Sequence, residues 1–412
     1  MTTWWKQYYY ALRAKQYRYF IPDNKKILEI GADGGLEHAV SGMRYDYIIL
    51  AGTLGGQSDI QQYLTDLRPL CHRDTRIIVE YYSYLWQYLL KMAEVLGLKE
   101  KQKTQNWLTW ADIENFLKLA DFDPIKQERS ILLPVDLWVI SYVVNRYLAK
   151  MPIFNALTLN HFIIARPVFK ELIERSVTIL VPCRNERGNI EQAITRTPAF
   201  GTRQEFIFVE GHSKDGTYEE VERVIKAYPA KDIRLYKQEG VGKGDAVRFG
   251  FDKATCEVLM ILDADLTVPP EDMPKFYDAI VSGKGEFING CRLIYPMEDE
   301  AMRFLNLLAN KFFGIFFTWL LGQRFKDTLC GTKVILKHHY QELVANRHYF
   351  GDFDPFGDFD LIFGAVKLNL KVVEVPIRYK SRMYGTTQIQ RFRHGLLLFK
   401  MCGFAMKKIK FI

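Results

Sequence analysis

The sequence predicts an α/β protein with two domains, each built on a mostly parallel β-sheet. Apolar runs typical of buried strands alternate with helical stretches along the chain. The 412 residues, of which 48% are hydrophobic and 25% charged, are enough for two globular cores. A short charged segment, residues 168–175, separates two alternating blocks and is the predicted joint between them.

Composition argues against several other classes of protein. The six cysteines lie far apart without paired ligand spacing, which indicates reduced thiols in a cytosolic compartment and neither a disulfide scaffold nor a zinc site. The chain does not open on a basic segment followed by an apolar one, so no secretory signal is expected. Residues 387–412 contain six lysines and arginines and no acidic residue, which predicts an anionic partner. No nucleic-acid-binding motif is present, so nucleic acid is not that partner.

Four strands are predicted in the second block, at Val177–Val181, Glu205–Val209, Ile233–Tyr236 and Val258–Leu262. Right-handed crossovers place such strands in one parallel sheet, with every loop after a strand at the same carboxyl edge. Residues that are distant in the sequence therefore meet at that edge.

Two aspartates, Asp263 and Asp265, follow the last of these strands directly. Residues two apart on an extended strand point the same way, so both carboxylates can hold a hard divalent cation against two phosphate oxygens. The plainer interpretation is a strand end with solvated acids, before a helix that begins near Pro269 and Pro270. The loops after the other strands favour the cation site.

Those loops carry the segments Pro182–Glu186, Glu210–Thr217 and Gly240–Ala246. In this order and with the aspartate pair, they resemble the family 2 glycosyltransferases, above all the dolichyl-phosphate mannosyltransferase branch and its bacterial polyprenyl-phosphate relatives. The resemblance spans residues 176–390. It implies the glycosyltransferase A fold, which is the nucleotide-diphospho-sugar transferase fold, for this part of the chain.

The resemblance implies a donor site whose base and ribose are lined by Pro182, Arg184 and Glu186. Glu210 takes the place of the first aspartate in the family's Asp-Asp-x-Ser motif and would accept hydrogen bonds from base or sugar. Gly211 replaces the second aspartate of that motif, so the resemblance does not indicate which nucleotide base is bound. Lys243 lies in a glycine-rich loop and would reach a donor phosphate as a point charge. The alternative is that this loop is an ordinary turn before a helix.

The same resemblance implies a metal site made by Asp263, Asp265 and Thr267, with Mg²⁺ or Mn²⁺ as the cofactor. Thr267 stands where the branch has a glutamine that contacts the metal. The metal would stabilise the departing diphosphate, so both aspartates are predicted catalytic residues.

Three arginines are predicted to bind the acceptor phosphate, because guanidinium binds phosphate with charge and fixed geometry. They are Arg292, Arg303 and Arg382. Arg292 belongs to a segment, Gly290–Leu293, that resembles the branch's Gly-Ser-Arg-Tyr, and is also predicted to be catalytic. For each arginine, a solvated surface charge is the plainer interpretation.

The predicted reaction moves a hexose, with inversion, from a nucleotide-diphospho-sugar to a polyprenyl phosphate. A phosphate acceptor is already ionised near neutral pH and needs no strong base. The alternative is transfer to a sugar hydroxyl in cell-surface polysaccharide synthesis, which needs one. The base candidates for that reaction are Asp352, Asp354, Asp358 and Asp360, although a loop of acids before a helix near Asp358 is the plainer interpretation.

Two segments suggest contact with an anionic membrane surface. Phe304–Gly322 is rich in aromatic residues and has basic flanks, but it falls short of the ~20 apolar residues that cross a bilayer. Residues 391–412 form a basic amphipathic tail. Together they predict peripheral attachment to the cytoplasmic face of the membrane without a transmembrane span. Packing in a soluble core is the alternative.

The first block, residues 1–168, resembles an incomplete class I S-adenosylmethionine methyltransferase, a Rossmann-like fold. Lys26–Gly35 matches its first strand and glycine loop, and later strands are expected at Tyr47–Leu50, Arg76–Val79 and His161–Arg166. Too little chain follows Gly35 for the second and third strands. A degenerate domain with a docking role is therefore predicted, and S-adenosylmethionine is not an expected cofactor. A bifunctional enzyme that keeps methyltransferase activity is the alternative.

Overall fold

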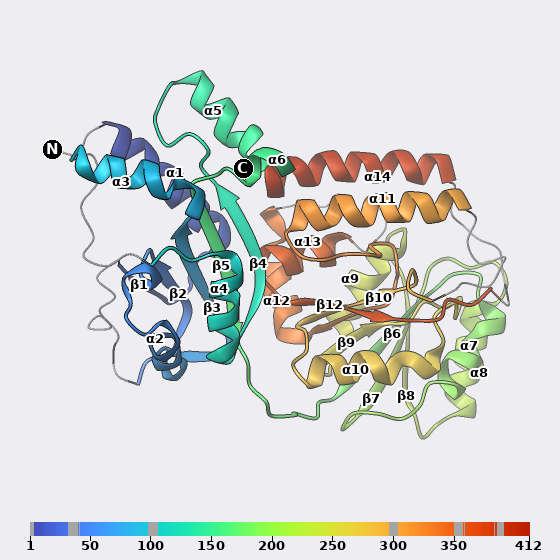
Figure 1. Ribbon diagram of the computed structural model, residues 1–412. Coiled ribbons are helices and arrows are strands. Elements are labelled where there is room, and N and C mark those ends of the chain that lie inside the picture. Colours follow the sequence, from blue (N-terminus) through green and yellow to red (C-terminus); the bar gives the residue numbers. More distant parts are fainter. Residues whose placement is uncertain are drawn as a thin grey trace. The chain divides into compact units, whose positions relative to one another are not determined.

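Contacts between residues divide the chain into two compact units in the computed structural model (Figure 1). The N-terminal unit comprises Met1–Phe169 with Ile409–Ile412, and the C-terminal unit comprises Lys170–Lys408. The structure describes residues 4–31, 40, 42–97, 106–295, 304–349, 357, 359–382, 384 and 391–412. The division between the units falls inside the charged segment at residues 168–175.

The N-terminal unit contains a five-stranded sheet with helices around it. Its elements are α1 (Trp4–Phe20), β1 (Ile27–Ile30), β2 (Tyr45–Ala51), α2 (Ile60–Asp66), β3 (Cys71–Tyr82), α3 (Gln87–Val95), α4 (Trp110–Leu119), β4 (Phe122–Ser130), α5 (Val139–Arg146), α6 (Pro152–Asn155) and β5 (Asn160–Pro167). The strand order is β1-β2-β3-β5-β4. The first three strands are parallel, and β5 is antiparallel to both β3 and β4. The strands predicted from apolar runs are present as β1, β2, β3 and β5.

Strand β4 was not predicted, because its sequence is rich in charged residues. Lys126 and Glu128 are nevertheless buried in the sheet. The Nζ atom of Lys410, from the C-terminus, lies 3.6 Å from a Glu128 carboxylate oxygen, and Lys150 adds a further positive charge nearby. Opposite charges thus compensate each other inside the unit. Lys410, expected on a membrane-surface tail, is instead buried here, because it is an ion-pair partner of Glu128.

Helix α1 is attached to the sheet through a buried carboxylate, Glu80 on β3. Arg13 and Tyr17 of α1 both donate to this carboxylate, the former from Nε at 2.7 Å. Asn160 of β5 donates to it from Nδ2 at 2.6 Å. Hydrogen bonds to a charged group in a dry environment are strong, so this network fixes α1 against the sheet.

The C-terminal unit holds a seven-stranded mixed sheet. Its elements are β6 (Val177–Cys183), α7 (Ile190–Thr195), β7 (Gln204–Glu210), α8 (Thr217–Ala227), β8 (Asp232–Lys237), α9 (Lys243–Lys253), β9 (Val258–Ile261), α10 (Met273–Val281), β10 (Phe287–Cys291), α11 (Phe304–Leu321), β11 (Lys333–Leu336), α12 (Lys337–Ala345), α13 (Phe359–Lys367), β12 (Val372–Pro376) and α14 (Arg391–Ala405), followed by a π-helix at Met406–Lys410. The order is β12-β10-β11-β9-β6-β7-β8. The four predicted strands, β6, β7, β8 and β9, are adjacent and parallel.

One glycine allows the sheet and its covering helix to approach closely. A Cβ atom at Gly250 of α9 would overlap side-chain atoms of Leu180 on β6 and contact Val209 on β7. Helix α9 therefore packs directly on β6 and β7, with its first residue, Lys243, at the carboxyl edge of the sheet. The packing of α9 thus positions this predicted phosphate-binding lysine.

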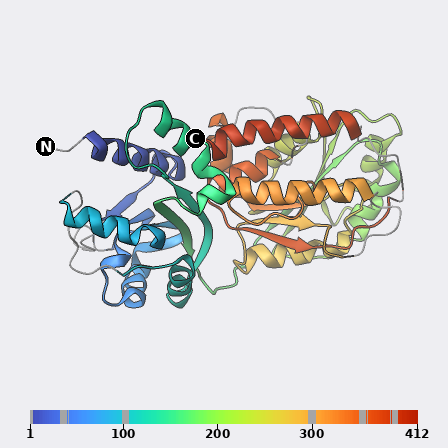
Figure 2. The ribbon, with the colours of Figure 1, turned by 45° about the horizontal axis from the view of Figure 1, so that its top comes forward.

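The two predicted membrane-contact segments form helices α11 and α14, the latter followed by the π-helix. They run side by side in both views (Figures 1 and 2), and the ring centroids of Phe313 and Phe399 are 5.5 Å apart. Phe312 and Ile315 of α11 are exposed, as is Phe399 of α14. Within the described part of the chain, no helix is long and apolar enough to cross a membrane.

Candidate active site

A cleft of about 290 Å³ opens at the carboxyl edge of β6, β7 and β9. Seven of the predicted site residues line it, namely Pro182, Arg184, Glu186, Lys243, Asp263, Asp265 and Arg382. The sheet topology explains this convergence, because the loops after parallel strands share one edge. The cleft therefore unites the predicted donor and metal residues with one of the predicted acceptor arginines.

Asp263 forms an ion pair with Lys243, whose Nζ lies 2.7 Å from Oδ1. Burial disfavours the charged carboxylate, but the charge and hydrogen bond of Lys243 outweigh burial and hold the pKa of Asp263 below its ordinary value. Asp263 is thus ionised at neutral pH. The lysine that was expected to contact a donor phosphate is therefore paired with the first aspartate in this structure.

Asp265, the second aspartate, is held by groups on two sides. Arg382 donates from Nη2 to Oδ2 at 2.7 Å, and the Thr267 hydroxyl donates to Oδ1 at 2.8 Å. The main-chain N–H of Thr267 also donates to Oδ1, at 3.2 Å. The hydroxyl predicted to bind the metal is thus adjacent to the second aspartate, and its role as a ligand stays a prediction.

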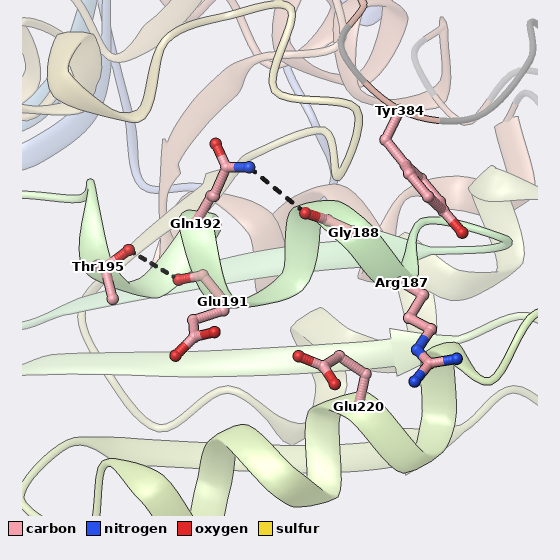
Figure 3. A pocket seen from close by; sticks show the side chains of 7 residues that line it. All are labelled: Arg187, Gly188, Glu191, Gln192, Thr195, Glu220 and Tyr384. Atoms are coloured by element: carbon pink, nitrogen blue, oxygen red, sulfur yellow. Dashed lines mark hydrogen bonds between the residues drawn. The ribbon is translucent and has the colours of Figure 1, made fainter.

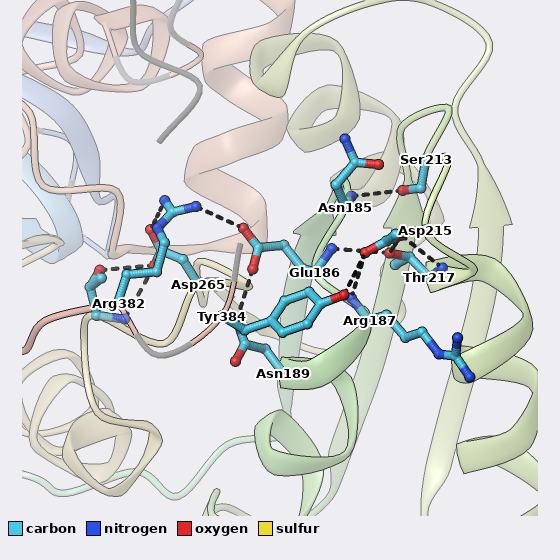
Figure 4. Close-up of polar contacts among 11 residues, drawn as sticks. Asn185, Glu186, Arg187, Asn189, Ser213, Asp215, Thr217, Asp265, Arg382 and Tyr384 are labelled. Carbon is cyan, nitrogen blue, oxygen red and sulfur yellow. Dashed lines mark hydrogen bonds and ion pairs between the residues drawn. The ribbon is translucent and has the colours of Figure 1, made fainter. Parts of the chain in front are cut away.

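Arg382 joins the second aspartate to Glu186 across the cleft (Figure 4). Its Nη1 donates to Oε1 of Glu186 at 3.0 Å, while Asn189 donates to Oε2 at 2.7 Å. Burial raises the pKa of Glu186 to about 7, although Arg382 and Asn189 act against burial. A carboxyl group that titrates near neutral pH therefore lies beside the predicted ribose site.

The substitution Glu186→Gln is expected to make stability less dependent on pH. The folded pKa lies above the ordinary value of 4.5, so the folded protein keeps a proton that the unfolded chain releases. Wild-type stability therefore falls as pH rises from about 4.5 to about 7, and glutamine cannot ionise. Between pH 5 and pH 8, the free energy of unfolding of the variant should therefore rise relative to that of the wild type by on the order of 2 kcal/mol. Thermal unfolding at both pH values measures the gain.

Glu219→Gln, at an exposed position on α8, is the matched control for this experiment. Its unfolding midpoint should follow that of the wild type at both pH values. Parallel curves for the Glu186 variant and wild type would show that Glu186 does not titrate in this window.

Left-handed backbone conformations occur in three loops around the cleft. The φ angles of Asn185, His212 and Leu266 are 55°, 60° and 52°. Such angles are uncommon for residues with a side chain and persist where the surroundings fix them. The main-chain N–H of Asn185 donates to the Ser213 hydroxyl at 2.9 Å, and Asn185 Oδ1 accepts from Lys214 N at 2.8 Å. The loops after β6 and β7 therefore hold each other in place.

The predicted residues outside the cleft have other partners. Glu210 is buried, and its carboxylate accepts a hydrogen bond from the main-chain N–H of Ser213 in its own loop. Arg303 lies outside the described residues, as do Asp352, Asp354 and Asp358. Asp360, the described member of the alternative base set, accepts a hydrogen bond from Arg347 Nε at 3.0 Å.

Arg292, predicted to bind the acceptor phosphate, forms a two-pronged ion pair with Asp327. Its Nε and Nη2 donate to the two carboxylate oxygens at 2.7 and 2.8 Å. The Arg292 side chain is 11% exposed, and its guanidinium lies 5.1 Å from the Tyr379 ring centroid. This geometry is typical of a strong structural pair, and it puts the carboxylate of Asp327 where a phosphate was expected.

The segment that holds Arg382 makes further contacts with the loops after β6, β7 and β9, and sequence patterns did not single out its Tyr384. The main-chain N–H of Lys380 donates to the carbonyl of Thr267 at 2.9 Å. The Tyr384 hydroxyl lies 3.4 Å from Asp215 Oδ2, and a Cβ atom at Gly188 would overlap its ring. No local pattern could reveal these contacts, because they join residues more than a hundred positions apart.

A second, wider cleft of about 630 Å³ lies along α7 and α8, with Tyr384 at one end (Figure 3). Its carboxylates are Glu191 and Glu220. Arg223 pairs with both, at 2.6 and 2.7 Å. These acids are therefore neutralised by a neighbouring arginine, and the chemistry predicted from the sequence maps to the first cleft.

The first cleft fits a hard divalent cation by its donor chemistry. Asp263, Asp265 and Thr267 offer oxygen atoms only, which Mg²⁺ and Mn²⁺ prefer. Each carboxylate already binds a positive group, Lys243 or Arg382. A divalent cation at the aspartates would replace these two contacts, while Arg382 would keep its hydrogen bond to Glu186.

The substitution Gly331→Ala is expected to lower the rate of the predicted hexose transfer by about tenfold, because a small misplacement of catalytic groups has a large effect on rate. A Cβ atom at this position would overlap both the Asp263 carboxylate and the Lys243 ammonium. The methyl group would push the pair apart without removing either charge. Steady-state kinetics measures the loss, with Gly403→Ala as the control, since nothing lies within 4 Å of a Cβ there. Unchanged kinetics for Gly331→Ala would contradict the role of this pair.

Residues 178–339 match the family described as glycosyl transferase family 2. The chain is 29% identical over 248 residues to dolichol-phosphate mannosyltransferase of Pyrococcus furiosus, which covers 57% of this chain and 67% of that protein. It is 23% identical over 235 residues to polyprenol monophosphomannose synthase of Mycolicibacterium smegmatis, covering 56% and 86%. A solved structure, glucosyl-3-phosphoglycerate synthase of Mycobacterium tuberculosis, overlaps 57% of this chain and 80% of its own at 17% identity and a TM-score of 0.41, too distant a likeness to carry a conclusion. Residues 178–339 of the C-terminal unit therefore match glycosyl transferase family 2, and they lie in an α/β fold with a mixed sheet.

Proposed function

We propose that the C-terminal unit transfers a hexose from a nucleotide-diphospho-sugar to a polyprenyl phosphate, with inversion at the anomeric carbon. The observation that carries this proposal is the meeting of two aspartates, Lys243 and Arg382 in one cleft at the sheet edge. The names of two relatives, a dolichol-phosphate mannosyltransferase and a polyprenol monophosphomannose synthase, support this class of acceptor.

The donor binds along the cleft, with its nucleoside against Pro182, Arg184 and Glu186 and its diphosphate toward Lys243. A bound Mg²⁺ or Mn²⁺ at Asp263, Asp265 and Thr267 would neutralise charge that develops on the diphosphate. Lys243 adds a positive charge from the N-terminal end of α9, where the helix dipole also favours an anion. The cleft thereby stabilises nucleoside diphosphate as a leaving group.

The acceptor supplies its own nucleophile. One phosphate oxygen forms the new bond to the anomeric carbon as the bond from that carbon to the donor diphosphate breaks, and nucleoside diphosphate leaves with the bonding electrons. The phosphate is ionised near neutral pH, so no side chain has to remove a proton. Arg382 is the basic residue that orients it, since its guanidinium lies in the cleft beside Asp265.

Transfer to a sugar hydroxyl has weaker support than transfer to a phosphate. That reaction needs a general base, and Asp360 is occupied by Arg347 with only 10% of its side chain exposed. The ion pair with Arg347 thus engages the carboxylate that the hydroxyl reaction would use as its base.

The proposed enzyme acts at the cytoplasmic face of a membrane, where its acceptor resides. The exposed Phe312, Ile315 and Phe399 on the α11–α14 pair support peripheral attachment, together with the exposed Lys311 and Lys400. Apolar and basic residues on one pair of helices suit an anionic headgroup layer. Such attachment should weaken at high salt.

We infer a docking role without catalysis for the N-terminal unit. Glu29 and Gly31 lie at the end of β1, and Gly35 falls outside the described residues. The carboxyl end of β3 is occupied by α1, because Arg13 and Tyr17 bind Glu80 there. Micromolar binding of S-adenosylmethionine in calorimetry would overturn this inference and support a bifunctional enzyme.

The test of the proposed function is a screen of radiolabelled nucleotide sugars. The purified full chain is incubated with each sugar, undecaprenyl phosphate and Mg²⁺ or Mn²⁺. We expect label in the organic-extractable lipid, lost on chelation of the metal, and a product whose anomeric configuration is opposite to that of the donor. Label on polysaccharide or protein alone would favour the hydroxyl acceptor and refute the proposal.

A further inference from the structure

The N-terminal unit exposes a large apolar surface that the proposed reaction does not use. Tyr88 and Val95 of α3 are 76% and 88% exposed, Trp138 before α5 is 83% exposed, and Ile153 of α6 is 80% exposed. Large apolar side chains exposed singly are ordinary, but a group of them on one face marks an interaction surface. We call this face, formed by α3 and the α5–α6 segment, the apolar face.

The sheet topology places these helices at one edge. The last residue of β3, Tyr82, pairs with the first residue of β5, Asn160, which pairs with the last residue of β4, Ser130. Helix α3 follows β3, and α5 and α6 lie between β4 and β5. The indole N–H of Trp86 donates to the carbonyl of Leu157 at 2.8 Å, which ties the start of α3 to the end of the α5–α6 segment. In Figures 1 and 2, α1, α3 and α5 gather at this end of the sheet.

The apolar face carries few charges. Residues 84–96 include only Lys91 and Glu94, although a quarter of the whole chain is charged. Residues 137–157 include only Arg146 and the buried Lys150. Exposed tryptophan and tyrosine on such a face are typical of the layer between water and hydrocarbon, because their rings have an apolar body and a polar end.

Basic residues lie beside the apolar face and point to an anionic partner. Helix α1 contains Lys6, Arg13, Lys15 and Arg18 and no acid. Partial burial lowers the pKa of the Lys15 ammonium, and the positive charges of Arg146 on α5 and of Arg18 lower it further. Like charges gathered next to an apolar face are unfavourable in isolation, and phosphate groups relieve that repulsion.

We propose that the apolar face inserts into the headgroup layer of an anionic bilayer, with Lys15, Arg18 and Arg146 against the lipid phosphates. This would be a membrane-binding surface in the N-terminal unit, in addition to α11 and α14. It requires neither a sugar donor nor a lipid acceptor. Its charge and aromatic content favour a lipid surface over a second copy of this chain.

A reporter at one position tests the proposal locally. All six native cysteines are buried, so Ile153→Cys can be labelled selectively with an environment-sensitive fluorophore. The full chain is mixed with vesicles of phosphatidylcholine containing phosphatidylglycerol. We expect the emission to shift to the blue and grow stronger. Leu119→Cys, on the exposed face of α4, is the matched control and should not respond.

A third labelled variant separates this proposal from the proposed function. Ile315→Cys reports on α11, where the side chain is 75% exposed. A response at position 315 without one at 153 would overturn the proposal and leave the proposed function standing. A response at 153 that grows with protein concentration in the absence of vesicles would assign the face to a second copy, which also overturns it.

Removing apolar side chains tests the strength of binding. The double variant Trp138→Ser/Ile153→Ser should bind the same vesicles about tenfold more weakly in a flotation assay, because two exposed side chains no longer leave water. Leu119→Ser should bind like wild type. Since all these side chains are exposed, thermal midpoints should stay the same. Equal vesicle binding by the double variant and wild type would contradict the proposal.

Discussion

Replacing Asp263 by asparagine is expected to lower kcat/KM for sugar transfer by about a hundredfold to a thousandfold, the range typical of losing one main electrostatic group at a reacting centre. The carboxylate lies in the cleft and is ionised because Lys243, 2.7 Å away, holds its pKa low. Asparagine keeps the shape but not the charge, so a divalent cation would lose a charged ligand and Lys243 loses its ion pair with Asp263. Initial rates with saturating Mg²⁺ or Mn²⁺ measure the effect.

Two variants make this result interpretable. Asp252→Asn removes an exposed acid from α9 and should keep wild-type rates. The Asp263 variant should also unfold near the wild-type temperature, which excludes loss of the fold as the cause. A rate within a few-fold of wild type would show that transfer does not depend on this carboxylate, and the proposed reaction would then be wrong.

Four strands of the C-terminal sheet could be predicted from local sequence, and the cleft at their carboxyl ends from the rules of parallel sheets, whereas β10, β11 and β12 were not predicted as strands. Four short runs rich in apolar residues predicted β6, β7, β8 and β9, and one rule about parallel strands predicted that their loops meet. Strand β4 could not be found this way. Its Lys126 and Glu128 give it the pattern of a surface segment, and only long-range charge compensation makes their burial stable.

Partners within the site were harder to predict than its location. Arg382, predicted to bind acceptor phosphate, lies in the cleft, but no sequence motif indicates that it bridges Glu186 and Asp265. Likewise, nothing near Arg292 indicates that Asp327 would take its guanidinium. Ion pairs join residues from separate loops, and their geometry depends on the packing of the whole unit. Sequence motifs therefore located the functional residues but not their resting contacts.

Removing one partner of the Arg292–Asp327 pair is expected to destabilise the C-terminal unit by about 3–5 kcal/mol, the usual effect of leaving a buried charge uncompensated. The Asp327 side chain is 1% exposed and accepts hydrogen bonds from the main chain of Arg292 as well as from its guanidinium. Asp327→Ala leaves that guanidinium with no carboxylate. Thermal unfolding should show the loss as a midpoint lower by roughly 10 °C.

The double variant Arg292→Met/Asp327→Leu separates the structural from the functional role of this arginine. Replacing both charges by apolar side chains of similar size should restore most of the stability, because no buried charge is left unpaired. If Arg292 serves only Asp327, this stable variant should transfer sugar at the wild-type rate. If it also binds the acceptor phosphate, the KM for the lipid should rise by about tenfold or more while the KM for the donor stays unchanged, since a guanidinium–phosphate contact is a charge-assisted hydrogen bond. A double variant as unstable as Asp327→Ala would show that the pair is not the source of the lost stability.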